Sequence, residues 1–376
     1  MPFNPTLDDI RKDLFVLDSE EFQVPEGIRL LSHENLTDSL SVSDLSVEYI
    51  PPNRWTNLFC GFRFLFHFFY ALQLLRAGDR NSVLIINGSG PLWLFVAYLK
   101  KWFYGHKRSL FLWFVYLEFQ LGTEKRFWFF PFLKFKTSWK EAIARAALAE
   151  YGLIPVWSRK QVLSHAKYYR LPEEKFIFLP YKSNHSKRPS YHIPIGNFIF
   201  SGGNNKRDYL CLVEAVQGTD IPVVISTTLP SLRQQIPKHS NIIVLSATEP
   251  AFAQLQAASR FVVLPTTHSG LRGTAEANFC NAMWHSKPVI ASCSMGAEDY
   301  IVEGETGYVV PAGDHEGLRK RILELWNDPE RCQEMGKKAR AYAEKNFTHK
   351  MFIRRVLRLA FVLGQRESTK NSEARR

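Results

Sequence analysis

The sequence has few of the residues that build metal sites or disulfide frameworks. Its five cysteines lie far apart and show neither CxxC nor CxH spacing: Cys60, Cys211, Cys280, Cys293 and Cys332. The histidines do not follow the spacing of metal ligands either. This pattern indicates neither a zinc site nor a set of disulfides, so we expect no metal site and a reducing compartment.

Long apolar runs and a targeting segment are also missing. The N-terminus, MPFNPTLDDIRKDLF, has neither the basic start nor the apolar run of a secretory signal peptide. The most apolar segment, residues 58–75, is interrupted by Arg63, His67 and Gln73, which argues against a membrane-spanning helix. We therefore expect a cytoplasmic protein, either free or at the inner face of the cell membrane.

Positive charge is in excess but is unevenly distributed. The 376 residues carry a formal net charge of +12, and aromatic residues make up 14% of the chain. Residues 1–50 hold eleven acids against three Lys and Arg, whereas residues 100–140 are strongly basic. Such an excess indicates an acidic partner, which could be a nucleotide, an anionic membrane or a nucleic acid.

Basic and aromatic residues are mixed within residues 100–136, in the runs KKWFYGHKR (100–108) and KRFWFF (125–130). Three interpretations are open: a peripheral surface facing anionic lipid, a nucleic-acid site, or ordinary core with solvated lysines. No RNP, helix-turn-helix or zinc-finger pattern accompanies these runs, so we expect no nucleic-acid partner. A membrane surface would suit a lipid-linked acceptor.

Short apolar segments alternate with helical patterns over most of the chain. The run SVLII (82–86) is typical of a buried parallel strand, and NGSGP (87–91) separates it from a helix. We expect strands at 28–31, 47–50, 82–86, 110–117, 153–157, 176–180, 197–200, 222–226, 242–245, 261–264 and 289–292. We expect helices at 60–77, 138–149, 159–169, 207–217, 249–258, 275–286, 314–327, 330–345 and 347–364. This alternation predicts an α/β protein with mostly parallel sheets.

The composition divides the chain into two Rossmann-like domains. Residues 181–196 are polar, with two prolines and a glycine, and this composition is typical of a linker. We expect domains at 1–190, with an irregular leader at 1–28, and at 191–346. A helix at 347–364 would cross back to the first domain, and 365–376 would form a disordered tail. The two doubly wound domains are expected to face a cleft that holds the ligand.

Residues 265–311 have the layout of an anion-binding edge. The strand FVVLP ends at Pro265, small and polar residues follow, and a helix is expected from about 275. The amides at the start of that helix have no partner within it, and the positive end of the helix dipole lies there. This arrangement suits a phosphate group.

Residues 197–347 resemble the nucleotide-sugar-binding domain of GT-B glycosyltransferases, most closely the retaining family 4, also called group 1. The resemblance lies in FSGG (200–203), Lys206-Arg207, Glu214-Ala215, AMW (282–284), KPVI (287–290), EGETGYVV (303–310), Gly313-Asp314, LWNDP (325–329) and Met335-Gly336. The first half of the chain matches only in its alternation of strands and helices.

The resemblance implies that a Gly-rich loop and nearby cations hold the donor diphosphate. The loop contains Gly202 and Gly203, and the cations are Lys206, Arg207 and Arg272. Arg207 stands where the family usually has lysine, and Gly203 stands where it usually has arginine. An arginine can pair with a diphosphate through two parallel hydrogen bonds.

The two glutamates of the family pattern, eight positions apart, are replaced in this sequence. Gly273 takes the place of the first glutamate and Asn281 that of the second. Asn281 can hydrogen-bond ribose hydroxyls, whereas Gly273 offers no side chain. Glu276 lies nearby and is the candidate to substitute for the lost sugar contact.

Backbone amides and three side chains complete the expected site. The amides around Thr274 and Ala275 suit a phosphate whatever the side chains are. Glu276, Arg207 and His268 are the candidate catalytic residues, because they lie in or beside the loop and helix start expected to meet the donor. The cations and amides would neutralise the leaving diphosphate.

The resemblance implies a glycosyltransferase that moves a sugar from a nucleotide-sugar donor to a glycan or lipid-linked acceptor, in surface polysaccharide or glycolipid assembly. It implies retention, a UDP- or GDP-sugar as substrate, no permanently bound cofactor and no obligatory metal. Two alternatives are open. The replaced glutamates suit a catalytically weak GT-B-like partner subunit, and the basic aromatic residues 100–136 suit a peripheral membrane-binding protein.

Overall fold

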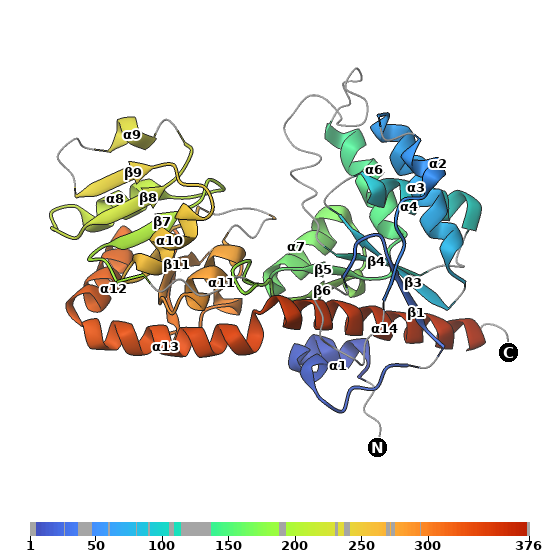
Figure 1. Cartoon of the computed structure of the whole chain (residues 1–376). Helices are drawn as coiled ribbons and strands as arrows, with labels where there is room; N and C mark the ends of the chain where they lie inside the picture. Colours follow the sequence, from blue (N-terminus) through green and yellow to red (C-terminus); the bar gives the residue numbers. More distant parts are fainter. Residues whose placement is uncertain are drawn as a thin grey trace. The chain divides into compact units, whose positions relative to one another are not determined.

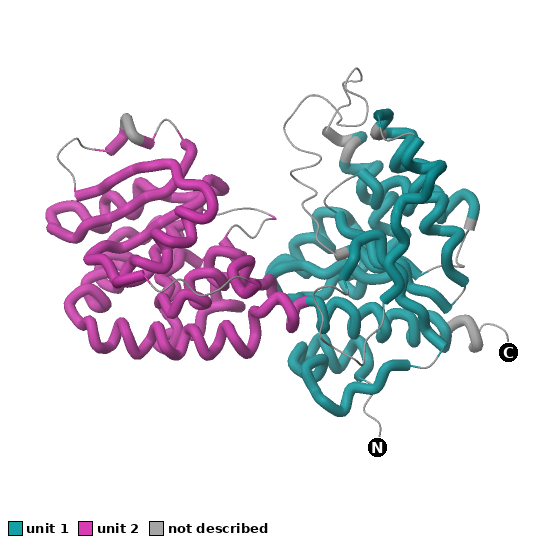
Figure 2. Tube along the Cα trace, viewed as in Figure 1, with its two compact units in different colours: residues 1–179, 353–376 teal, residues 180–352 magenta. Residues whose placement is uncertain are grey.

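The computed structural model forms two compact units, residues 1–179 together with 353–376, and residues 180–352 (Figure 2). It describes the whole chain except residues 1–4, 26, 37–46, 59–60, 80, 89–90, 105–108, 114–136, 188–192, 230–231, 237–240, 268–270, 272–274, 294 and 374–376.

The first unit is built on a parallel sheet with the strand order β2-β1-β3-β4 (Figure 1). Its strands are β1 (Arg29–Ser32), β2 (Glu48–Tyr49), β3 (Ser82–Asn87) and β4 (Ser109–Trp113). Residues 83–86 of β3 are buried, which explains their unbroken apolar run. A bridge from Phe111 to Leu153 links β4 to the small parallel pair β5 (Ile154–Val156) and β6 (Phe176–Phe178).

Helices pack around the first unit's strands in a shared apolar core. They are α3 (Arg63–Ala77), α4 (Leu92–Leu99), α6 (Thr137–Ala149) and α7 (Arg159–Tyr169), and the unit also contains α1 (Leu7–Lys12) and α2 (Arg54–Asn57). Single turns occur at η1 (Leu14–Asp18), η4 (Glu173–Lys175) and the π-helical η3 (Lys100–Tyr104). In the core, the hydroxyl of Tyr151 donates to the carbonyl of Trp93 at 2.8 Å. Two large aromatic side chains are therefore buried without leaving that hydroxyl unsatisfied.

The second unit has a six-stranded parallel sheet in the order β12-β11-β10-β7-β8-β9. Its strands are β7 (Ile199–Gly202), β8 (Val223–Ser226), β9 (Ile242–Leu245), β10 (Val262–Leu264), β11 (Val289–Cys293) and β12 (Gly307–Pro311). Counted within the unit and from the other edge, this order is 3-2-1-4-5-6, the order of the doubly wound Rossmann fold. Successive residues face opposite sides: β8 sends Val223 and Ile225 to one buried cluster and Val224 to another.

Helices cover both faces of this sheet. They are α8 (Tyr209–Val216), α9 (Leu232–Gln235), α10 (Ala251–Ala258), α11 (Glu276–Trp284), α12 (His315–Asn327) and α13 (Pro329–Asn346), with a 3-10 turn at η5 (Ala297–Asp299). α8 and α12 contribute to one buried cluster, and α11 and α13 to the other. The prediction of two α/β, Rossmann-like units is confirmed, and a cleft between them stays a prediction.

The final helix, α14 (His349–Glu373), runs past the predicted end at residue 364. The expectation of a disordered tail from residue 365 is therefore wrong up to residue 373. Gly364, at the predicted end of this helix, lies within α14 and is a point of close packing. A Cβ atom at this position would lie 2.8 Å from Cγ2 of Ile28 and 2.9 Å from Cγ2 of Val83. The glycine serves close approach and not helix termination.

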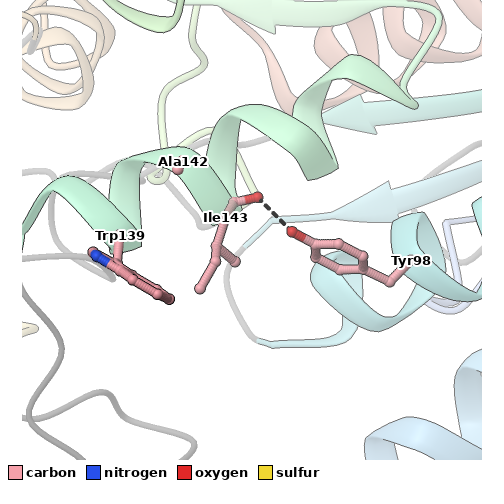
Figure 3. Close-up of a pocket in the computed structure, with 4 residues that line it drawn as sticks. All are labelled: Tyr98, Trp139, Ala142 and Ile143. Atoms are coloured by element: carbon pink, nitrogen blue, oxygen red, sulfur yellow. Dashed lines mark hydrogen bonds between the residues drawn. The ribbon is translucent and has the colours of Figure 1, made fainter.

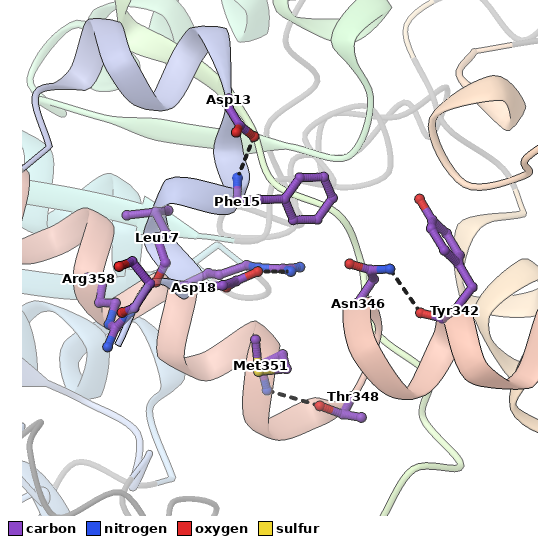
Figure 4. A network of polar contacts seen from close by, with 11 residues as sticks. Asp13, Phe15, Leu17, Asp18, Tyr342, Asn346, Thr348, Met351 and Arg358 are labelled. Atoms are coloured by element: carbon purple, nitrogen blue, oxygen red, sulfur yellow. Dashed lines mark hydrogen bonds and ion pairs between the residues drawn. The ribbon is translucent and has the colours of Figure 1, made fainter. Parts of the chain in front are cut away.

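The leader is more ordered than the predicted irregular segment at 1–28. Thr6 and Asp9 form a reciprocal capping box that starts α1, and η1 follows it. Both ends of the chain meet in the first unit, where the guanidinium of Arg355 on α14 pairs with the Asp18 carboxylate at 2.5 Å. Arg358 donates to the carbonyls of Leu17 and Ser19 (Figure 4). The leader and α14 therefore stabilise each other.

The units divide at residues 179 and 180, earlier than the predicted 190 and 191. The start of the expected linker belongs to the second unit: the amide of Tyr181 donates to the Tyr300 hydroxyl at 2.9 Å, and that of Ser183 to the Phe347 carbonyl at 2.8 Å. Polar composition alone does not distinguish a linker from a segment whose backbone is hydrogen-bonded to a folded unit. No helix in the described part of the chain is long and apolar enough to cross a membrane.

Candidate functional site

The strand order of the second unit places its switch point between β7 and β10. From β7 the chain winds outward through β8 and β9, and it then returns to β10 and winds the other way. Ligands of such sheets bind outside the carboxyl ends of the strands at this point. The two loops meet there, because Arg207 forms an antiparallel bridge with Thr266 and the amide of Thr267 donates to the Lys206 carbonyl at 3.0 Å.

The Gly-rich loop after β7 is fixed by the neighbouring strand. Gly203 has a φ of 113°, a conformation that favours glycine, and its amide donates to the Ser226 carbonyl at 3.0 Å. The side-chain oxygen of Asn204 accepts bonds from the Thr227 hydroxyl and the Thr228 amide, both at 2.8 Å. The loop is therefore pre-organised by contacts with the segment after β8.

Arg207 is folded back against this loop. Its Nε donates to the Gly202 carbonyl at 3.0 Å, and its Nη1 to the Asn205 carbonyl at 3.1 Å. A Cβ atom at Gly203 would lie 2.9 Å from Nη2 of Arg207, so glycine makes room for the guanidinium. Burial lowers the pKa of Arg207, and Tyr209 and Glu276 oppose that shift. An arginine stays charged at neutral pH even so.

Glu276 begins α11 and is buried beside Arg207. Its Oε2 accepts a bond from the Ala275 amide at 3.1 Å, so the carboxyl group is held by the backbone at the start of the helix. Burial raises the pKa of Glu276 to about 7, against the lowering effects of backbone hydrogen bonds and of Arg207. A carboxyl group in this range can hold or release a proton near neutral pH.

Asn278 ties α11 to the Gly-rich loop. Its Nδ2 donates to the Gly202 carbonyl at 3.3 Å, the same oxygen that accepts from Arg207. The structure thus brings together Gly202, Gly203, Arg207, Ala275 and Glu276 of the predicted site. Lys206 is exposed at the tip of the loop, with a φ of 52°.

Asn281 makes a different contact from the predicted one to ribose. Its Oδ1 accepts from the Ser183 hydroxyl at 2.9 Å and from the Asn184 amide at 2.8 Å, and the residue is buried. Its acceptor oxygen therefore holds the segment that enters the second unit. The predicted His268, Arg272, Gly273 and Thr274 lie outside the described residues.

Sequence reasoning missed the residues that shape this loop. Asn204, Asn278 and Tyr209 were not among the expected site residues, yet the Tyr209 hydroxyl donates to the Gly203 carbonyl at 2.5 Å. The run Gly202-Gly203-Asn204 was the available signal, because an asparagine beside glycines commonly hydrogen-bonds nearby backbone. In the described part of the chain, no group of His, Cys, Asp or Glu side chains could hold a metal ion.

A separate pocket lies in the first unit, between α4 and α6 (Figure 3). It has a volume of 440 Å³ and is lined by Tyr98, Trp139, Ala142 and Ile143. The Tyr98 hydroxyl donates to the Ile143 carbonyl at 3.0 Å, so this polar group is engaged in joining the two helices. The lining is mainly apolar and offers no charged group for phosphate.

Residues 211–328 match the sequence model of the family described as "Glycosyl transferases group 1". The second unit contains a group 1 glycosyl transferase domain. This domain match starts within α8 and includes α11, so it covers Glu276 and Asn281, while the Gly-rich loop precedes it.

Two curated relatives match part of the chain. D-rhamnosyltransferase WbpZ of Pseudomonas aeruginosa is 33% identical over 146 residues, which are 36% of this chain and 37% of the relative. Trehalose synthase of Pyrococcus horikoshii is 39% identical over 83 residues, 22% of this chain and 20% of the relative. The chain thus spans only about a fifth to just over a third of the length of these relatives.

Solved structures match nearly the whole chain. A glycosyltransferase from Rickettsia africae aligns with a TM-score of 0.58 at 15% identity, covering 94% of this chain and 93% of that one. Anabaena HepE in complex with UDP also gives a TM-score of 0.58, at 13% identity, and covers 92% and 100% of the two chains. The chain therefore has the GT-B fold, with two Rossmann-like domains.

Proposed function

We propose that the protein is a glycosyltransferase that moves a sugar from a nucleotide-sugar donor to a glycan or lipid-linked acceptor. The observation that carries this proposal is the half-buried Arg207, held at the Rossmann switch point by its contacts with the Gly-rich loop, just before the residues that match the group 1 model. A cation fixed at the carboxyl ends of β7 and β10 suits a diphosphate.

The proposed donor is a UDP- or GDP-sugar, bound as a substrate. Structural neighbours support this class: HepE was solved with UDP and with UDP-glucose, and TarM with UDP and α-GlcNAc-glycerol. TarM matches with a TM-score of 0.56 at 16% identity. The name of WbpZ supports sugar transfer as the reaction of a protein with a similar group 1 domain.

In the proposed reaction, the bond between the anomeric carbon and the phosphate oxygen breaks as an acceptor hydroxyl forms the new glycosidic bond. Arg207 and the backbone amides at the start of α11 would stabilise the negative charge on the leaving diphosphate. The resemblance to family 4 supports retention of configuration. Glu276, with its pKa near neutral, is the described group in this site that could hold a proton there.

The proposed setting is surface polysaccharide or glycolipid assembly in the cytoplasm, with His268, Arg272, Gly273 and Thr274 completing the site. A second candidate function is that of a catalytically weak GT-B-like partner subunit, favoured by the replacement of both family glutamates. The contact of Asn281 with Ser183 and Asn184 adds to this candidate, since its acceptor oxygen is engaged in a structural contact.

A panel of UDP-, GDP- and ADP-sugars tests both candidates on the full chain. Thermal stabilisation by one donor, together with release of its nucleotide, supports the transferase. Stabilisation without release, in the presence of extracted glycans and lipid-linked sugars, supports the partner subunit. If no donor raises the unfolding temperature, the proposed donor site is wrong.

A further inference from the structure

The outer surface of α2 and α3 in the first unit is apolar where a soluble helix is usually polar. Its large exposed apolar side chains include Trp55, Leu58, Phe62, Leu65 and Phe69, which we call the α2–α3 face. Their exposed fractions are 74%, 69%, 69%, 38% and 36%. Large apolar side chains in this number mark a surface that another molecule covers.

The helical spacing shows that α3 is apolar on two sides. Phe62, Leu65 and Phe69 follow the spacing of one helix stripe, which faces solvent. The opposite side, with Tyr70 and Leu74 among its residues, is buried in the core of the unit. A helix that needed only the core would carry polar residues on its outer stripe, so the exposed stripe requires its own explanation.

The charge of the segment that contains α2 and α3 indicates which kind of molecule covers the α2–α3 face. Residues 49–78 contain no aspartate or glutamate, although they include Arg54, Arg63 and Arg76. Arg54 and Arg76 are exposed. Two copies of such a face would repel each other, whereas an anionic bilayer would attract it and accept the aromatic side chains at its interface.

The remaining exposed aromatics strengthen the contrast between the units. Trp102 and Phe103 on η3 and Trp139 on α6 are 78%, 69% and 62% exposed, and all belong to the first unit. Among the described residues, the large exposed apolar side chains of the second unit include no Phe or Trp. The feature is therefore local to one unit and does not reflect overall composition.

We propose that the α2–α3 face docks the protein on an anionic lipid bilayer, with its aromatic side chains inserted at the level of the headgroups. Such docking places a helix in the interface plane and needs no spanning segment. The face lies outside the donor site and involves none of its residues, so docking is independent of the proposed transferase activity. It assigns the membrane contact to α2 and α3, in addition to any contribution from residues 100–136.

Vesicle co-sedimentation of the full chain tests the proposal. The protein is expected to bind phosphatidylcholine vesicles that contain phosphatidylglycerol, and to bind pure phosphatidylcholine weakly. Trp55→Ser with Phe62→Ser should lower the partition coefficient about tenfold, because two inserted aromatic side chains are lost. Arg54→Glu with Arg76→Glu keeps the apolar side chains and should remove the preference for anionic vesicles.

A matched control is available in the second unit. Ile195 and Ile243 are 64% and 61% exposed, so Ile195→Ser with Ile243→Ser removes a similar exposed apolar pair and should leave vesicle binding unchanged. Unfolding temperature and donor-induced stabilisation, measured on the same samples, separate loss of docking from loss of folding or donor binding. If Trp55→Ser with Phe62→Ser unfolds the chain, Arg54→Glu with Arg76→Glu alone tests the proposal.

Three results would overturn the proposal. The first is wild-type protein that stays in the supernatant with anionic vesicles. The second is binding that all the α2–α3 variants retain. The third is a dimer in light scattering that Trp55→Ser with Phe62→Ser converts to a monomer, which would assign the face to a second copy of the chain.

Discussion

Arg207 is the side chain on which the proposed donor site depends most. Arg207→Ala is expected to weaken nucleotide binding by about 1.5–3 kcal/mol, because a charge-assisted contact to the diphosphate is lost. Titration calorimetry with the nucleotide of the stabilising donor measures this loss. Arg319 is the matched control, since its Nη1 also donates to two backbone carbonyls, those of Ala215 and Gln217. Arg319→Ala should affect stability without changing nucleotide affinity. If both variants bind the nucleotide with equal affinity, the proposed phosphate site at Arg207 is wrong.

Glu276 predicts a pH dependence of stability. Its pKa is raised from 4.5 to about 7, so the folded state prefers the protonated carboxyl. That preference stabilises the fold fully below pH 4.5 and is lost as the pH rises through 7. Glu276→Gln should therefore match the wild type near pH 4.5 and exceed its unfolding free energy by up to about 3 kcal/mol at higher pH. Urea unfolding across this range measures it, and parallel profiles would contradict it.

Asn281 distinguishes a structural contact from a ribose contact. Asn281→Ala leaves the buried hydroxyl of Ser183 and the amide of Asn184 without their acceptor, so the unfolding free energy should fall by about 1–3 kcal/mol. Asn281→Asp keeps an acceptor and should lose less. Chemical unfolding and nucleotide titration are compared for the same variants. If Asn281→Ala lowers nucleotide affinity and leaves stability unchanged, the result would support the predicted ribose contact.

At the scale of elements, the sequence predicts most of the second unit because apolar periodicity and secondary structure agree there. α12 begins and ends within one residue of the prediction, and β9 matches it residue for residue. α1 was missed because six residues give too short a pattern, and its stability depends on the burial of Leu7 and Ile10. The end of α14 was misplaced because residues 365–373 are all polar, so no apolar pattern marks them as helix.

The leader and α14 also predict an effect of one carboxylate. Arg355 is fully buried and bound to Asp18, so Asp18→Ala leaves a buried charge without its partner. The free energy of unfolding should fall by about 3 kcal/mol. Asp8→Ala breaks the exposed pair of Asp8 with Arg11 and should cost less than about 1 kcal/mol. Urea unfolding followed by tryptophan fluorescence compares the two, and equal losses would contradict a stabilising role for Asp18.

At the scale of the whole molecule, alternation of strands and helices was enough to predict two Rossmann-like units, whereas the GT-B fold was implied by the resemblance of residues 197–347 to GT-B glycosyltransferases. The expected return of the last helix to the first domain agrees with the division into units, in which residues 353–376 belong to the first unit. Of the candidate site, the sequence predicted the backbone of the Gly-rich loop and of the helix start, and it predicted Arg207. The contact of Asn281 with Ser183 was not predicted, because it joins residues 98 positions apart.

This division predicts different fates for two truncations. Residues 180–352 contain both buried clusters of the second unit and the candidate donor site, so this fragment should fold alone and bind nucleotide with an affinity similar to that of the full chain. Residues 1–352 lack the buried side chains of α14 beyond Phe352, together with Arg355 and Arg358, so the first unit should lose its cooperative unfolding transition. Calorimetry of both fragments with and without nucleotide compares them. A fragment 1–352 that keeps both transitions would show that α14 is dispensable, and a fragment 180–352 that folds without binding nucleotide would place part of the donor site outside the second unit.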